Sequence, residues 1–117
     1  VDIVPSPSIM LNGLEGSRLG VWSAHGEGKF DLPYSEEKYS IAAKYSYDSY
    51  PANPNGSKFN TAMLVSDDGR HLVMMPHIER SIHPHNWAFY PEERDEKYSP
   101  WIKVFNNSYD WVLNKNK

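Results

Sequence analysis

The chain has 117 residues, a formal net charge of −3 and no cysteine. This length fits one small domain or a piece of a larger one, and the charge provides no basic surface for nucleic acid. The lack of cysteine excludes disulfides, thiolate metal sites and a cysteine nucleophile within these residues, and it fits a cytoplasmic protein. No run of about 18 apolar residues is present to predict a membrane span.

The first half of the chain predicts short extended elements separated by proline and glycine. Strands are expected at residues 1–4, 8–11, 19–24 and 39–47. Residues 35–38 favour a short helix with Ser35 as its N-cap. Two prolines and the Asn55-Gly56 turn signal predict a loop over residues 49–57, for which the sequence suggests no role beyond turn formation.

The second half predicts a hairpin over about residues 60–75. Its strands are the apolar runs 61–65 and 71–75, and Asp67-Asp68-Gly69 between them is a turn signal. Both runs are apolar on both faces, so we expect the hairpin to be covered on two sides. A helical turn is expected at residues 77–82, followed by a long surface loop.

The clearest element is a C-terminal helix over about residues 100–113. Ser99 is the expected N-cap, and Pro100 takes the first helical position. The residues expected on one face are Trp101, Val104, Phe105, Ser108, Trp111 and Val112. This stripe predicts that the helix packs on the sheet.

The most informative pair of polar residues is His77 and Glu79, which follow the hairpin directly. Side chains two apart in an extended segment point to the same side, so the carboxylate would orient the imidazole. Such a pair is the base and its orienting group from a catalytic triad. The alternative is a loop histidine at a helix start and an acid in the first helical turn.

Other polar residues have competing interpretations. The glycines of His25-Gly26-Glu27-Gly28 either let backbone N–H groups approach a carboxylate ligand or form a tight bend. His83 and His85 would complete a metal cluster with His77 and Glu79, although Pro84 favours a surface loop. His71 is expected to be structural. Tyrosines at alternate strand positions are typical of half-buried packing, with carbohydrate binding as the alternative.

Five segments of the chain occur in the same order in one known family. They are Ala24-His25-Gly26-Glu27-Gly28, Tyr50-Pro51-Ala52-Asn53-Pro54-Asn55-Gly56-Ser57, Asp68-Gly69-Arg70-His71, Met74-Met75-Pro76-His77-Ile78-Glu79-Arg80 and Ser99-Pro100-Trp101. On these segments the chain resembles, over nearly all its length, the C-terminal end of the phosphoribosylformylglycinamidine synthase family of purine biosynthesis. The resemblance implies an α/β fold, in which residues 1–117 form part of the open flavodoxin-like sheet of a class I (triad) glutamine amidotransferase domain.

The resemblance also implies roles for individual residues. His77 and Glu79 match the catalytic histidine and glutamate, while Ile78 replaces the proline usual between them. His25 and Gly26 match a segment that contacts the amino-acid end of glutamine. The triad cysteine would precede this chain, so the chain is expected to be a C-terminal fragment that is inactive alone.

The enzyme that the resemblance implies is an ATP-dependent ligase. It converts formylglycinamide ribonucleotide, glutamine and ATP to the amidine, glutamate, ADP and phosphate, using Mg²⁺. No cofactor is expected on this chain, and its expected partners are glutamine and the rest of the same polypeptide, without nucleic acid or membrane. Unpaired sheet edges in a fragment predict self-association. The alternatives are a triad glutaminase serving another synthetase and a non-catalytic interaction module that uses exposed aromatic residues.

Overall fold

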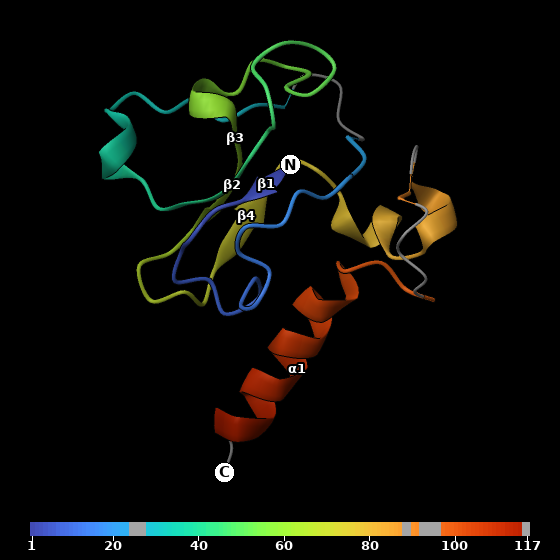
Figure 1. The fold of residues 1–117 in the computed structure, drawn as a ribbon. Helices are drawn as coiled ribbons and strands as arrows, with labels where there is room; N and C mark the ends of the chain where they lie inside the picture. The colour runs from blue at the N-terminus through green and yellow to red at the C-terminus, as the bar shows by residue number, and fades with distance from the viewer. Residues whose placement is uncertain (24–27, 88–89, 92–96, 116–117) are drawn as a thin grey trace.

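A four-stranded antiparallel sheet is the centre of the fold, in the order β1-β2-β3-β4 (Figure 1). The computed structural model describes residues 1–23, 28–87, 90–91 and 97–115. The strands are β1 (Asp2–Ile3), β2 (Ile41–Lys44), β3 (Thr61–Val65) and β4 (Leu72–Met74). With the helix α1 (Ile102–Lys115), this sheet confirms the predicted α/β class, the hairpin and the C-terminal helix.

Short 3-10 helices connect the larger elements. They are η1 (Glu36–Lys38), η2 (Lys58–Asn60), η3 (Ile78–Ser81) and η4 (Pro84–Asn86). The predicted helical turns at residues 35–38 and 77–82 are therefore confirmed as η1 and η3. Ser35 precedes η1, but its side chain makes no capping hydrogen bond and instead donates to Glu37 at 2.7 Å.

The core is formed by strand residues of the sheet, the N-terminal turns and the start of α1. Its buried members are Ile3, Leu11, Leu14, Leu19, Ala42, Ala43, Tyr45, Ala62, Met63, Val65, Ile78, Trp101 and Val104. The set includes Ile78, which directly follows His77. The backbone around the candidate site is thus tied to the core through a buried side chain.

Two of the strands expected in the N-terminal half do not form. Residues 8–11 make consecutive turns, in which the Ser8 hydroxyl accepts a hydrogen bond from the Leu11 N–H at 3.2 Å. Residues 19–24 make no regular strand in their described part, and the neighbouring ladder contacts are isolated bridges at Arg18 and Trp22. Leu11 and Leu19 are both buried, so these apolar runs fill the core without pairing as strands.

The hairpin is covered less completely than its sequence predicts. β3 lies between β2 and β4 and is buried at most positions, whereas β4 pairs only with β3 among the described strands. Val73 in β4 is 54% exposed. The expectation of cover on two sides is therefore wrong for β4, because the face of this strand that carries Val73 is open to solvent.

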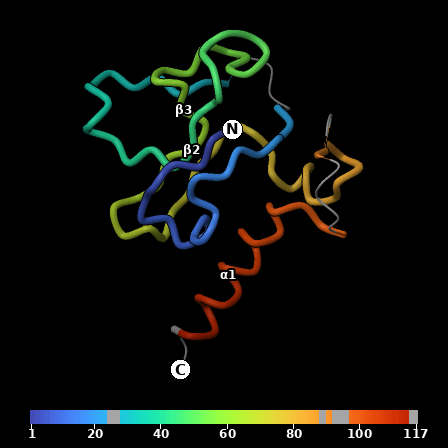
Figure 2. The backbone as a smooth tube through the Cα atoms, viewed as in Figure 1, coloured from blue at the N-terminus to red at the C-terminus, as the bar shows by residue number. Residues whose placement is uncertain are grey.

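Only the beginning of α1 is buried in the body. Trp101 and Val104 are fully buried, and the Trp101 indole N–H donates to the carbonyl of Gly20 at 2.8 Å. Phe105 and Val112 are half exposed, and the C-terminal end of the helix points away from the sheet (Figure 2). The expected apolar stripe is therefore fully buried only in its first part. Farther along it, the Trp111 ring lies 5.4 Å from the guanidinium of Arg70.

The expected N-cap also has a different role. The Ser99 hydroxyl donates to the carbonyl of Ser81 at 2.5 Å, and this bond ties the start of the helical region to η3. None of the described helices is both long and apolar enough to cross a membrane.

Candidate active site

The position of His77 is set by the end of the hairpin. The N–H of Met75 still bonds the carbonyl of Ala62 at 3.1 Å, and Pro76 then stops the pairing because it has no N–H to donate. His77 remains extended, and its N–H donates to the carbonyl of Trp22 at 3.0 Å. The next residue, Ile78, is buried and begins η3.

His77 and Glu79 form the hydrogen-bonded pair that the sequence predicts. His77 Nδ1 lies 2.7 Å from Glu79 Oε1, and the two side chains are 39% and 58% exposed. The predicted contact is present, although the backbone differs, because His77 is extended while Glu79 lies in the first turn of η3. The helix-start alternative thus describes the backbone, and the predicted contact between carboxylate and imidazole is present. The catalytic role of the pair stays a prediction.

The pair has a defined electrostatic arrangement. The hydrogen bond from His77 lowers the pKa of Glu79 below its ordinary value, and the backbone N–H of Glu79 and the charge of Arg80 act in the same direction. An ionised carboxylate at Nδ1 favours the tautomer that carries its proton there. Nε2 then has a free lone pair and is able to act as a general base.

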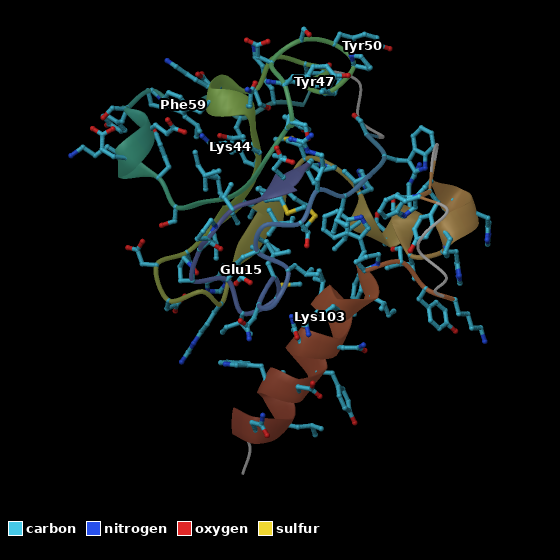
Figure 3. The ribbon with its side chains drawn as sticks, in the orientation of Figure 1. Glu15, Lys44, Tyr47, Tyr50, Phe59 and Lys103 are labelled. Carbon is cyan, nitrogen blue, oxygen red and sulfur yellow. The ribbon has the colours of Figure 1, made fainter. Side chains whose placement is uncertain are left out.

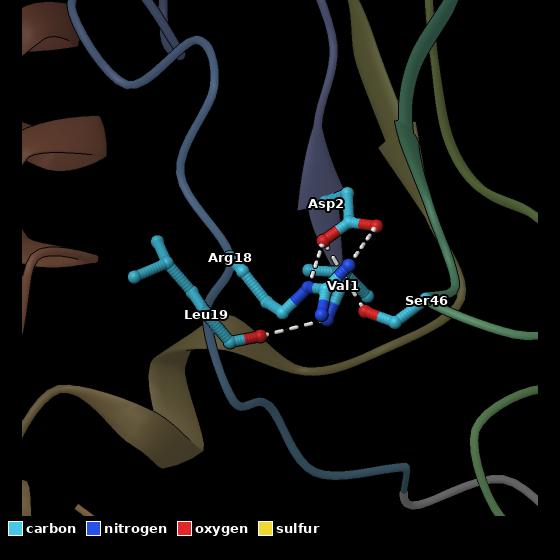
Figure 4. A network of polar contacts seen from close by, with 5 residues as sticks. All are labelled: Val1, Asp2, Arg18, Leu19 and Ser46. Carbon is cyan, nitrogen blue, oxygen red and sulfur yellow. Dashed lines mark hydrogen bonds and ion pairs between the residues drawn. The ribbon is translucent and has the colours of Figure 1, made fainter. Parts of the chain in front are cut away.

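Two contacts hold β1 against the segment that continues to the candidate site. Val1 N donates to the carbonyl of Leu19 at 2.7 Å, and Arg18 pairs with Asp2 at the same distance (Figure 4). The hydrogen bond from Arg18 lowers the pKa of Asp2. These contacts fix the segment after Arg18 against β1, and this segment continues to Trp22, whose carbonyl accepts the His77 N–H.

The other candidate residues do not join the pair. The rings of His83 and His85 stack with centroids 5.3 Å apart, and the described residues contain no group of three potential metal ligands. His71 lies before β4, where its N–H donates to Ser66 in the hairpin turn. His25 and Gly26 lie outside the described residues, so their predicted contact with glutamine stays a prediction.

The alternate tyrosines do not make one aromatic platform. Tyr45 is buried, whereas Tyr47 and Tyr50 are 52% and 80% exposed in the loop that follows β2 (Figure 3). Trp87 and Tyr90 form an edge-on contact of their own, with ring centroids 4.7 Å apart.

The sequence did not indicate what the loop from Asn53 to Ser57 does. Asn53 Nδ2 donates to the Ser57 carbonyl, and Asn53 Oδ1 accepts from the Ser57 N–H, each at 2.9 Å. From this closed loop, Asn55 Nδ2 donates to the carbonyl of Gly28 at 2.9 Å, and the Ser57 hydroxyl accepts the Phe30 N–H at 3.0 Å. The polar residues around the Asn-Gly turn were the only local signal.

A sequence model described as the CobB/CobQ-like glutamine amidotransferase domain matches residues 1–112. Among curated relatives, phosphoribosylformylglycinamidine synthase of Dictyostelium discoideum is 43% identical over 92% of this chain, and that of Homo sapiens 40% over 97%. The probable chloroplastic/mitochondrial phosphoribosylformylglycinamidine synthase of Arabidopsis thaliana is 45% identical over 96%. The chain spans about 9% of the length of each of these three relatives.

Proposed function

The chain belongs to the family of CobB/CobQ-like glutamine amidotransferase domains, and we propose that it supplies the general acid–base pair of a glutaminase site. The observation that carries this proposal is the 2.7 Å contact between His77 Nδ1 and Glu79 Oε1. No cysteine is present in the sequence. The proposed site is therefore completed by a nucleophile from elsewhere in a longer polypeptide.

We propose that this polypeptide is a phosphoribosylformylglycinamidine synthase. The names of the relatives support this assignment, as does the small share of their length that the chain spans. Its overall reaction would transfer ammonia from glutamine to formylglycinamide ribonucleotide with ATP hydrolysis, and this chain alone would be inactive. The cytoplasm remains the predicted compartment, although the Arabidopsis relative is named chloroplastic/mitochondrial.

His77 would act twice in the glutaminase half-reaction. After a thiolate attacks the glutamine carboxamide, protonated His77 donates its proton to the departing ammonia, leaving a glutamyl thioester. Neutral His77 then removes a proton from the water that hydrolyses the thioester to glutamate. Glu79 would hold the Nδ1 tautomer and stabilise the imidazolium in both steps.

ATP and Mg²⁺ would bind outside this chain. Mg²⁺ prefers carboxylate and phosphate oxygens, and the described residues bring together no three candidate metal ligands. We therefore assign no step involving these groups to the described residues of this chain. Their proposed contribution is to activate the amide of the ribonucleotide in the synthetase part of the polypeptide.

The proposal is tested by His77→Ala in the intact polypeptide. We expect glutamine-dependent turnover to fall by at least about a hundredfold, because general acid–base catalysis contributes about that much. Turnover with added ammonia should be unchanged, since ammonia bypasses the glutaminase. His71→Ala is the matched control, because His71 bonds through its backbone in the hairpin turn. An equal loss of both activities in His77→Ala would refute the assigned role.

A further inference from the structure

We infer that Ser99 and Trp101 are positioning residues for the His77–Glu79 pair. Ser99 bonds to η3, the short helix that carries Glu79, and Trp101 bonds to residues 20–22, the segment that holds the backbone of His77. Both side chains are fully buried, so they would act without touching a substrate. This inference rests on the proposed function and extends it to the start of the C-terminal helical region.

The pair needs outside support because it is partly exposed. Water competes for the hydrogen bond between His77 and Glu79, since solvent reaches both side chains. A surface contact of this kind contributes at most about 1 kcal/mol and does not by itself hold two side chains in one geometry. The orientation of the imidazole therefore depends on how firmly the backbone on each side of the pair is held.

Ser99 holds the end of η3. Its hydroxyl donates to the carbonyl of Ser81 at 2.5 Å, and its N–H donates to the carbonyl of Ile82 at 2.6 Å. η3 has only four residues, and Glu79 lies in its first turn. Because a 3-10 helix of this length is little more than one turn, fixing its end also fixes the direction in which the Glu79 side chain leaves the backbone.

Trp101 holds the segment beside His77. Its indole N–H donates to the carbonyl of Gly20 at 2.8 Å. Farther along this segment, the carbonyl of Trp22 accepts the His77 N–H at 3.0 Å. The position of the His77 backbone is therefore linked through residues 20–22 to a side chain buried in the core.

Trp87 joins the two supports. Its indole N–H donates to the same Ser81 carbonyl at 2.8 Å, and its ring packs on Gly20, where an added Cβ would lie 3.0 Å from Trp87 Cε3. Figure 1 shows η3 and η4 beside the start of α1. The segments that carry Glu79 and hold His77 are thus fixed relative to each other by one group of packed side chains.

The first test is Ser99→Ala in the intact polypeptide, with glutamine and ammonia as alternative nitrogen donors. We expect kcat with glutamine to fall about tenfold, because a small misplacement of a catalytic group by a remote substitution costs up to about a hundredfold. The KM for glutamine should change less than about twofold, since the pair acts in the transition state. Turnover with ammonia should stay at the wild-type value. Trp101→Phe keeps a buried ring but removes the N–H, and it should show the same pattern.

Ser8→Ala is the matched control. Ser8 is also a buried serine, and its hydroxyl accepts the N–H of Leu11 at 3.2 Å within the N-terminal turns. Both activities of this variant should equal those of wild type. Amide hydrogen exchange at Arg80, whose N–H donates to the His77 carbonyl at 3.2 Å, should become faster in Ser99→Ala and stay unchanged in Ser8→Ala.

Combining Ser99→Ala with Glu79→Ala separates positioning from general stability. If Ser99 acts through Glu79, the double variant should lose no more glutamine-dependent turnover than Glu79→Ala alone. A role limited to packing would add its own loss whether or not Glu79 is present. Additive losses of that kind would overturn the positioning role of Ser99.

The positioning role is also overturned for each residue whose variant keeps the wild-type kcat with glutamine, or whose loss with glutamine is matched by an equal loss with ammonia. His77→Ala separates these outcomes from failure of the proposed function. If His77→Ala loses only glutamine-dependent turnover while Ser99→Ala and Trp101→Phe behave as Ser8→Ala does, the glutaminase assignment stands and the positioning roles alone are wrong. If His77→Ala loses both activities equally, the proposed function fails, and exchange at Arg80 still shows whether Ser99 holds η3.

Discussion

The hydrogen bond between His77 and Glu79 links the protonation of one side chain to the position of the other. The bond occupies His77 Nδ1 at 2.7 Å and leaves Nε2 for proton transfer. Both groups remain partly exposed. The hydrogen bond therefore contributes little to folding, and its main physical effect is to orient the imidazole.

A pH-dependent stability difference should follow from this bond. The hydrogen bond from His77 lowers the pKa of Glu79 from its ordinary value of 4.5. A carboxylate with a lowered pKa stabilises the fold above its unfolded pKa and loses that contribution as pH falls through the folded pKa. At pH 7 we expect wild type to exceed Glu79→Gln by less than about 1 kcal/mol in the free energy of unfolding, because the pair is exposed.

Urea unfolding over a series of pH values would measure this difference. It should be present at pH 7 and disappear as pH falls through the folded pKa of Glu79, which lies below 4.5. A difference that persists or increases in acid would show that Glu79 stabilises the fold by something other than its charge.

Among the elements, the hairpin turn depends on a glycine with no room for a side chain. Gly69 has φ +76°, and a Cβ there would lie 2.0 Å from the carbonyl oxygen of Pro7. Gly56 has the same φ, but a Cβ there would meet nothing within 4 Å. The two glycines therefore separate the cost of a left-handed conformation from the cost of a steric clash.

We predict that Gly69→Ala destabilises the protein much more than Gly56→Ala. Gly56→Ala should cost about 1 kcal/mol, the usual cost of the left-handed conformation for a residue with a Cβ. Gly69→Ala adds a backbone clash and should cost about 2 kcal/mol more. Urea unfolding of both variants measures the two losses. Equal losses would mean that the turn moves away from Pro7 without penalty.

The sequence predicted those elements whose signals are local. The Asp-Gly turn defined the hairpin, and Ser99 with Pro100 defined the region where α1 begins. Short apolar runs such as residues 8–11 were less informative, because a buried run has the same composition whether or not it pairs as a strand. The helix was predicted correctly, but the exposure of Phe105 was not, because hydrophobic periodicity does not show how wide the packed face of a helix is.

The same distinction applies to the candidate site. His77 and Glu79 are two residues apart, so their contact was predictable from local geometry. The contact of Asn55 with Gly28 spans 27 residues and depends on the tertiary fold. Neither hydrophobic periodicity nor a turn signal in a single sequence predicts such a contact.

At the scale of the whole molecule, exposed apolar side chains and an unpaired strand edge among the described residues are consistent with packing against other polypeptide segments. Described apolar side chains on α1 are half exposed, including Phe105, Val112 and Leu113, and β4 is an edge strand in the described sheet. Edges and faces of this kind favour association, so self-association of the separate chain stays a prediction. The relatives are about ten times longer than the segment that they share with this chain.

The most direct test of the proposed acid–base pair is a double-mutant cycle of His77→Ala and Glu79→Ala in the intact polypeptide. Glutamine-dependent and ammonia-dependent turnover are measured for each variant. If Glu79 acts only through His77, the double variant should lose no more glutamine-dependent turnover than His77→Ala alone. Ammonia-dependent turnover should be the same in all variants. Losses that multiply in the double variant, or a parallel fall with ammonia, would contradict the central claim that these two residues form one glutaminase acid–base unit.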